Sequence, residues 1–230
     1  MAEGSRVLVL QNKVTGEMVQ IDPEKARLRR MRKRVFAWGR LFPQGGWGIL
    51  VTLTYRPGVE PSPRDISAFL RRVRRALGTD LLGYCWVAEV QKRGALHYHV
   101  VLVVRGPGIR IPKPDEVGWW PHGMSRVERA RNPVGYLGRY VGKEDQKRGL
   151  PAGFRMFAVV WRAVLPVARL LLRISGLPAW LLDRLGVDEI LASGECPRRW
   201  PGRGWIWRNR VFRSPWVLVG VFFIPISGIS

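Results

Sequence analysis

The stretch Trp86–Val104, WVAEVQKRGALHYHVVLVV, decides the fold that this chain can adopt. It holds two apolar runs, and the tripeptide Lys92-Arg93-Gly94 separates them. Side chains alternate between the two faces of a strand, so His97 and His99 leave the same face. A three-residue hairpin loop with glycine in the left-handed position fits the tripeptide, and it places Glu89 opposite His97. We therefore expect one carboxylate and two imidazoles to converge on one face of a sheet.

These three side chains form a donor set that suits a divalent ion such as Mg, Mn, Fe or Zn. His-x-His also occurs in strands for purely structural reasons, and that interpretation stays open on these two residues alone. The predicted register, which brings Glu89 beside His97, favours a metal site.

A second stretch, Val134–Glu144, has the sequence VGYLGRYVGKE and predicts a helix. Asn132 suits its N-cap, and the proline after it suits the first turn. Tyr136, Tyr140 and Lys143 then fall at i, i+4 and i+7, on one face of the helix. Tyrosines at this spacing also serve as packing residues. Two aligned tyrosines and a lysine after a metal patch favour a chemical role.

Together with the hydrophobic strand VTLTY at 51–55, these parts resemble the HUH endonuclease superfamily. The resemblance is to rolling-circle replication initiators of small single-stranded DNA phages and some plasmids, and it covers about residues 47–157. The family pattern is a hydrophobic strand, then Glu with His-hydrophobic-His, then Tyr-x-x-Lys, often with a second tyrosine four residues away. One departure is Arg139, where lysine is frequent; it keeps the charge but changes the donor geometry.

The resemblance implies metal-dependent, strand-specific nicking and joining of single-stranded DNA at a replication origin. Mg or Mn would bind at Glu89, His97 and His99, and the protein would keep the 5′ phosphate as a phosphotyrosine. Tyr136 and Tyr140 would be the nucleophiles, with overlapping roles. Tyr140, which Lys143 follows in the Tyr-x-x-Lys pattern, is favoured for the first cut.

Two other functions remain open. A single-strand DNA transposase of the same superfamily also places His-x-His before tyrosine, although two tyrosines four residues apart favour the initiator. The alternative from a different class is a non-catalytic RRM-like nucleic-acid-binding module with a decayed site. The presence of Glu89, both histidines, both tyrosines and Lys143 counts against a module that has lost its chemistry.

Composition points to a polyanionic partner. The 230 residues carry a formal net charge of +22, which favours nucleic acid or an anionic membrane. Two cysteines make no disulfide framework or zinc pattern, which fits a reducing cytoplasm. The resemblance to phage and plasmid initiators implies that this is the cytoplasm of a bacterial host. No stretch predicts a signal peptide or a stable membrane span. The predicted DNA contacts are Arg71, Arg75, Arg93 and Arg139.

The order of predicted elements indicates an α+β fold, an antiparallel sheet with flanking helices. The resemblance makes it the five-stranded, RRM-like HUH core, at residues 46–150. A basic segment, 1–45, precedes it with a hairpin at 5–21 and a helix at 23–40, and a helical and β extension, 151–230, follows. A helix at 63–77 is expected to be capped by Ser62. No Walker-type motif is present, so a host helicase and polymerase are expected partners.

Overall fold

The structure, a computed structural model, describes residues 4–91, 94–130, 132–141, 150–162, 166–201 and 204–225. The chain forms two compact units: residues 31–165 make one, and residues 1–30 with 166–230 make the other. The first unit contains a five-stranded antiparallel sheet flanked by helices, so the predicted α+β class is confirmed.

The strand order of this sheet is β6-β3-β5-β4-β7. Its strands are β3 (Trp47–Tyr55), β4 (Leu81–Val90), β5 (Leu96–Val104), β6 (Gly123–Ala130) and β7 (Phe157–Trp161). β5, which carries the two histidines, is the central strand, and a short 3-10 turn, η1 (Gly78–Asp80), leads into β4. The fifth strand, β7, comes from the range that the sequence assigned to the C-terminal extension.

The hairpin between β4 and β5 has the predicted register. The backbone N–H of Gln91 donates to the carbonyl of Ala95 at 2.9 Å, and Gly94 N–H donates back to the Gln91 carbonyl at 2.8 Å. Gly94 has φ +82°, the left-handed conformation that glycine adopts without steric cost. Glu89 consequently lies directly opposite His97. A slip of one residue would have moved Glu89 to the other face.

One face of the sheet packs against α2 (Asp65–Leu77) and carries the main hydrophobic core. The helix buries the predicted stripe of Ile66, Phe69, Leu70 and Val73. Alternate sheet residues meet it, as the period of two requires, among them Leu53, Tyr84, Trp86, Tyr98 and Val100.

The predicted start of α2 is two residues too early: the Ser62 hydroxyl oxygen accepts the Arg64 backbone N–H at 3.3 Å, but this contact precedes the helix. The helix begins at Asp65, and its N-cap residue, Arg64, makes no side-chain cap hydrogen bond. The physical reason is that the Asp65 carboxylate accepts two hydrogen bonds at this end, from the Ser62 backbone N–H at 2.9 Å and from the Tyr55 hydroxyl at 2.8 Å.

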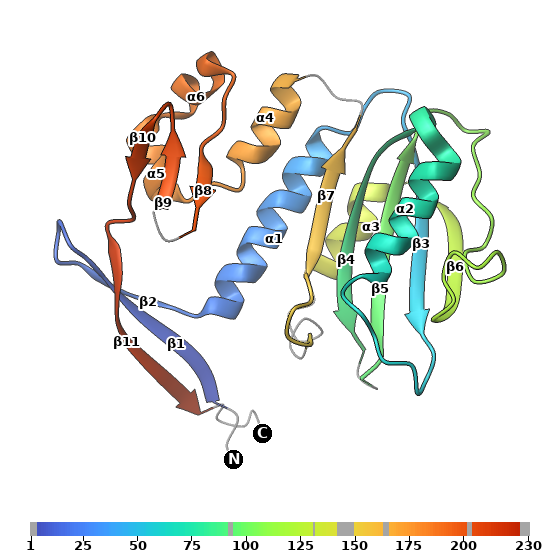
Figure 1. Cartoon of the computed structure of the whole chain (residues 1–230), viewed down its shortest axis with the longest axis horizontal. Coiled ribbons are helices and arrows are strands. Elements are labelled where there is room, and N and C mark those ends of the chain that lie inside the picture. The colour runs from blue at the N-terminus through green and yellow to red at the C-terminus, as the bar shows by residue number, and fades with distance from the viewer. Residues whose placement is uncertain are drawn as a thin grey trace. The chain divides into compact units, whose positions relative to one another are not determined.

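The opposite face of the sheet packs against α3 (Pro133–Val141), which contacts β3, β4 and β5 (Figure 1). The Asn132 side-chain oxygen accepts the Gly135 backbone N–H at 2.8 Å, so the predicted N-cap is confirmed. Leu137 is fully buried and anchors the helix. Cap and anchor together fix the height at which Tyr136 stands over the sheet.

Tryptophans hold β7 at the sheet edge. From Met31 onward, α1 (Pro23–Arg40) belongs to this unit, and its Trp38 ring stacks on Trp161 with centroids 4.8 Å apart. The Trp38 indole N–H donates to the Val160 carbonyl, and the Trp161 indole N–H donates to the Trp38 carbonyl, both at 3.2 Å. The Trp161 ring lies against Gly83, where a Cβ atom would stand 2.3 Å from a ring carbon.

The second unit contains two three-stranded sheets. The predicted N-terminal hairpin is confirmed as β1 (Gly4–Asn12) and β2 (Met18–Ile21), and β11 (Trp216–Pro225) pairs with β1. The other sheet is β8 (Arg198–Trp200), β9 (Gly204–Trp207) and β10 (Arg210–Phe212). Three short helices accompany it: α4 (Pro166–Ile174), α5 (Ala179–Leu185) and α6 (Val187–Ser193). In the described parts of the chain, no helix has the length and apolarity needed to span a membrane.

Candidate active site

Glu89, His97 and His99 lie on the sheet face that α3 covers, as the hairpin register requires. They are 3, 4 and 6 % exposed, although all three are polar. Burial of polar groups costs free energy unless they are hydrogen-bonded or bind an ion. The contacts of each residue therefore indicate which chemistry this face of the sheet can support.

Glu89 and His99 form a direct pair. The His99 Nε2 atom lies 2.8 Å from a Glu89 carboxylate oxygen, diagonally across β4 and β5. The contact fixes the plane of the His99 ring and leaves the Nδ1 atom on the side of α3. A carboxylate that orients an imidazole in this way is common in catalytic and metal sites.

His97 is held by neighbours on both sides. Its Nδ1 atom lies 3.1 Å from the Thr54 hydroxyl of β3 and 3.3 Å from the Gln91 side-chain nitrogen. Its ring is nearly parallel to that of His99, at an interplanar angle of 28° with centroids 6.5 Å apart. The two imidazoles thus stand side by side on β5 in fixed orientations.

Tyr136 reaches this cluster from α3. Its hydroxyl lies 3.4 Å from His99 Nδ1 and 3.3 Å from the Thr52 hydroxyl. Glu89, His99 and Tyr136 therefore form one continuous line of polar contacts from β4 through β5 to α3. The Tyr136 side chain is half-buried.

The tyrosines on the other face are in a different environment. Burial raises the pKa of Tyr55 and of Tyr98 well above the ordinary value, and the hydrogen bond from Tyr55 to Asp65 raises the Tyr55 pKa further. These two phenols stay protonated and belong to the core. Among the tyrosine side chains that the structure describes, Tyr136 is the one on the histidine face.

The three predicted metal ligands fit an ion by chemistry and by placement on one face. In the described residues, however, no three histidine, cysteine, aspartate or glutamate side chains are already grouped as a metal centre. An ion bound between Glu89 and His99 would have to replace the direct contact of these two side chains.

Several predicted residues fall beyond this description. Lys143 and Arg93 lie outside the described residues, and for Arg139 and Tyr140 the structure describes the backbone in α3 but not the side chain. Arg71 and Arg75 are exposed on α2, which covers the sheet face opposite the histidines. Their predicted DNA contact is therefore not part of the histidine cluster.

The sequence reasoning missed the role of Thr52 and Thr54. Their side chains lie on the same face of β3. In the sequence, threonines at this spacing indicate only a preference for strand structure. Pairing of β3 with β5 sets Thr52 opposite His99 and Thr54 opposite His97, and that register could not be derived without the structure. His122, expected to be structural or to contact DNA, lies 3.5 Å from Asp65 and packs on Trp120, which supports a structural role.

Comparisons with known proteins give the following. Residues 48–145 match the family model of the replication-associated protein ORF2, and the match includes β3, the histidine hairpin and α3. This supports a protein of the replication-initiator type. Among solved structures, the hypothetical protein ORF119 from Sulfolobus islandicus rod-shaped virus 1 is 12% identical, with 54% of this chain and 98% of that chain covered and a TM-score of 0.31. No curated protein matches the chain.

Proposed function

We propose that this protein is a rolling-circle replication initiator that nicks and rejoins single-stranded DNA through a 5′-phosphotyrosine intermediate, in the cytoplasm of a bacterial host. The observation that carries the proposal is the Tyr136 hydroxyl, 3.4 Å from a histidine that a buried glutamate orients. The family match over residues 48–145 supports the same function, because it spans every residue of this cluster.

The reaction conserves the energy of the cut bond. The tyrosine oxygen attacks the scissile phosphorus, the bond from phosphorus to the 3′ oxygen breaks, and a phosphotyrosine ester forms. The tyrosine proton leaves to water, and the departing 3′ oxygen takes up a proton from water. The protein keeps the 5′ phosphate, so a later 3′ hydroxyl can reverse the step and join the ends.

The residues of this chain position the nucleophile. Thr52 and His99 hold the Tyr136 oxygen from two sides, which restricts the phenol to one direction of approach. A phenol has an ordinary pKa of about 10 and needs activation at neutral pH. Lys143 and Arg139 lie close to the tyrosines in sequence, and we propose that their charge favours the tyrosinate.

A divalent ion, Mg or Mn, would be held by Glu89, His97 and His99. When bound, it would supply Lewis-acid polarisation of the scissile phosphate. His99 Nδ1 faces Tyr136 while its Nε2 contacts Glu89, and we propose that this histidine orients the nucleophile.

The proposal includes two nucleophiles. Initiation needs one cut to start, and a second cut to release the finished circle while the first tyrosine still holds an end. Residues four apart on a helix are about 6 Å apart at Cβ, so Tyr136 and Tyr140 can serve one phosphate in turn. The roles overlap, and Tyr140, which Lys143 follows in the sequence, is favoured for the first cut.

Denaturing gels of the protein with 5′- and 3′-labelled single-stranded origin DNA and Mn or Mg test the function. Wild type should form a covalent adduct that carries the 5′-phosphate side. Tyr136→Phe and Tyr140→Phe should each weaken the reaction, and only the double variant should lose all adduct. Tyr55→Phe, which alters a phenol on the opposite face, is the control and should keep the adduct.

The outcomes separate the alternatives. DNA binding by wild type without any adduct would identify a non-catalytic binding module instead. Full adduct in the double variant would show that another residue is the nucleophile. If Tyr136→Phe behaved as wild type in both nicking and circle release, Tyr136 would be a packing residue and the two-nucleophile scheme would be wrong.

A further inference from the structure

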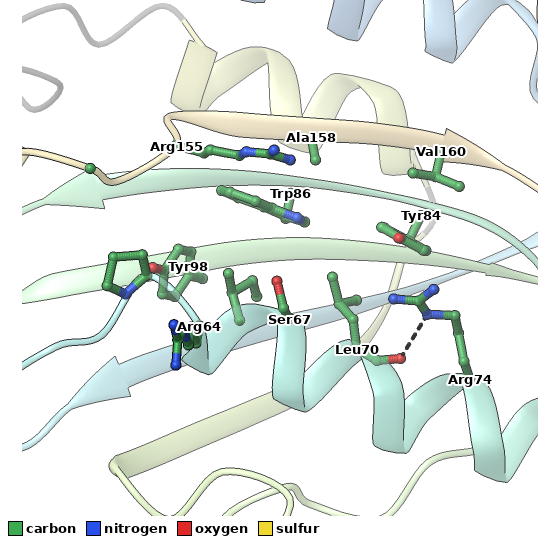
Figure 2. Close-up of a pocket in the computed structure, with 13 residues that line it drawn as sticks. Arg64, Ser67, Leu70, Arg74, Tyr84, Trp86, Tyr98, Arg155, Ala158 and Val160 are labelled. Carbon is green, nitrogen blue, oxygen red and sulfur yellow. Dashed lines mark hydrogen bonds between the residues drawn. The ribbon is translucent and has the colours of Figure 1, made fainter.

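A groove of about 420 Å³ opens on the sheet face opposite Glu89, His97 and His99. It lies between α2 and the β4–β7 side of the sheet, where the helix leaves part of the sheet uncovered (Figure 2). Sites for small organic ligands have volumes of about 300–1,000 Å³, so one nucleotide-sized group fits here. The candidate active site does not use any of the residues that line this groove.

The floor of the groove is apolar, with half-buried Ala158 and Val160 on β7, while Tyr84 and Trp86 of β4 are only 6 and 4 % exposed. Tyr84 and Trp86 alternate along β4, and Ala158 and Val160 stand beside them on β7. Leu70 of α2 closes the helix side. Figure 2 shows the Tyr84 and Trp86 rings next to each other between the helix and β7. A lone small anion would make no use of this apolar strip, whereas a group that joins an apolar part to an anion would.

The rim carries three arginines from two separate parts of the chain. Arg64 and Arg74 are near the two ends of α2, and Arg155 lies two residues before β7; all three are exposed. Within the described chain, none of the lining residues is acidic. Arg74 is already oriented, since its Nε donates to the Leu70 carbonyl at 3.3 Å and its guanidinium lies 5.8 Å from the centre of the Tyr84 ring.

A flat apolar floor with guanidinium groups around it matches the chemistry of a nucleotide, a planar base joined to a phosphate. The net charge of +22 favours a polyanion as the source of that nucleotide. We infer that this groove binds one nucleotide of single-stranded DNA, away from the cleaved linkage. The identification of the strand as DNA rests on the proposed function. The protein would then hold a strand at two places, on opposite faces of one sheet.

The first test removes the charges of the rim. Arg74→Ala/Arg155→Ala is compared with Arg40→Ala/Arg110→Ala, which removes the same charge from exposed positions outside the groove. Fluorescence anisotropy with a labelled single-stranded oligonucleotide should show about tenfold or greater weakening for the groove pair. The control pair should stay within about twofold of wild type. Equal losses for both pairs would mean general charge attraction and would overturn the inference.

The second test fills the groove and keeps every charge. Ser67→Phe adds a ring to an exposed residue of α2 that lines the groove, and Ala76→Phe adds the same ring to an exposed residue of α2 that does not. Only Ser67→Phe should weaken strand binding. Thermal unfolding checks both variants; if Ser67→Phe fails to fold, the arginine pairs decide the matter alone.

A competition experiment identifies the source of the nucleotide. Deoxythymidine monophosphate and inorganic phosphate are each added to the complex of wild type with the labelled strand. The monophosphate should compete weakly and phosphate should not compete, because the floor recognises the base. If the groove variants lose monophosphate binding but keep full strand affinity, the groove serves a free nucleotide and the inference is wrong.

The proposed function and this inference fail in different ways. At saturating DNA, the groove variants should still form the covalent adduct at close to the wild-type rate, since Tyr136 lies on the other face. Absence of adduct from wild type would contradict the proposed function and leave the binding comparison intact. Unchanged affinity in the groove variants, with normal adduct formation, would contradict the inference alone.

Discussion

Thr52→Val tests whether the Tyr136 hydroxyl is positioned for attack. Valine has nearly the same shape as threonine and β-branching suits the strand, so the substitution removes little except the Oγ1 contact to Tyr136. That contact is 3.3 Å long, beyond the usual range of about 2.5–3.0 Å for two hydroxyls. It should therefore contribute about 0.5–1 kcal/mol, the lower part of the usual range for a hydrogen bond.

This free energy corresponds to a loss of about two- to fivefold in the rate of adduct formation. The assay is single-turnover formation of the covalent adduct, and it is done in two backgrounds. In Tyr140→Phe, where only Tyr136 can attack, Thr52→Val should show the full loss. In Tyr136→Phe, where Thr52 has no hydroxyl to hold, Thr52→Val should change nothing. The comparison is a double-mutant cycle and isolates the coupling between the two residues.

Thr54→Val is the matched control on the same strand face. Its hydroxyl lies 3.1 Å from His97 rather than beside the nucleophile, so its effect should be the same in both backgrounds. If Thr52→Val instead slowed the two backgrounds equally, the Thr52 contact would not serve Tyr136. The positioning argument would then be refuted, even if nicking itself were established.

Two further predictions follow from the site and the fold. His97→Ala or His99→Ala should abolish adduct formation while much DNA affinity remains, because arginine and lysine contacts to phosphates supply most binding. Excess EDTA should stop adduct formation by wild type as well, and full cleavage in EDTA would contradict metal catalysis. Gly83→Ala should lower the free energy of unfolding by about 1–3 kcal/mol in denaturant titrations, since the new Cβ would lie 2.3 Å from the Trp161 ring. Gly138→Ala, with open space around it, should instead raise the free energy of unfolding by up to about 1 kcal/mol.

The histidine hairpin could be predicted because its determinants are local. A three-residue loop with one glycine fixes the register, and the alternation of side chains then places Glu89 and both histidines without knowledge of the rest of the chain. The N-cap at Asn132 was predictable for the same reason, since it depends on a bond to a residue three positions away. These two local features supply most of the candidate site.

The features that the sequence did not predict depend on contacts between distant residues. β7 pairs with β4, and two hydrogen bonds across more than a hundred residues hold it there: Trp38 donates to the Val160 carbonyl and Trp161 to the Trp38 carbonyl. The Asp65 carboxylate at the start of α2 accepts hydrogen bonds from the Ser62 backbone N–H and from Tyr55 of β3. The groove on the α2 face likewise combines a helix with β4 and β7. No periodicity within one segment encodes such pairings.

The anchoring of α3 limits how two tyrosines could share one site. Positions four apart on a helix differ by about 6 Å along its axis, so the phenols of Tyr136 and Tyr140 cannot occupy the place beside His99 together. Sliding α3 by a full turn would pull the fully buried Leu137 out of its contacts and break the Asn132 cap. Both costs oppose movement of the helix. In the proposed scheme, the scissile phosphate must therefore move between the two cuts, and a DNA-holding site elsewhere on the protein would guide that movement.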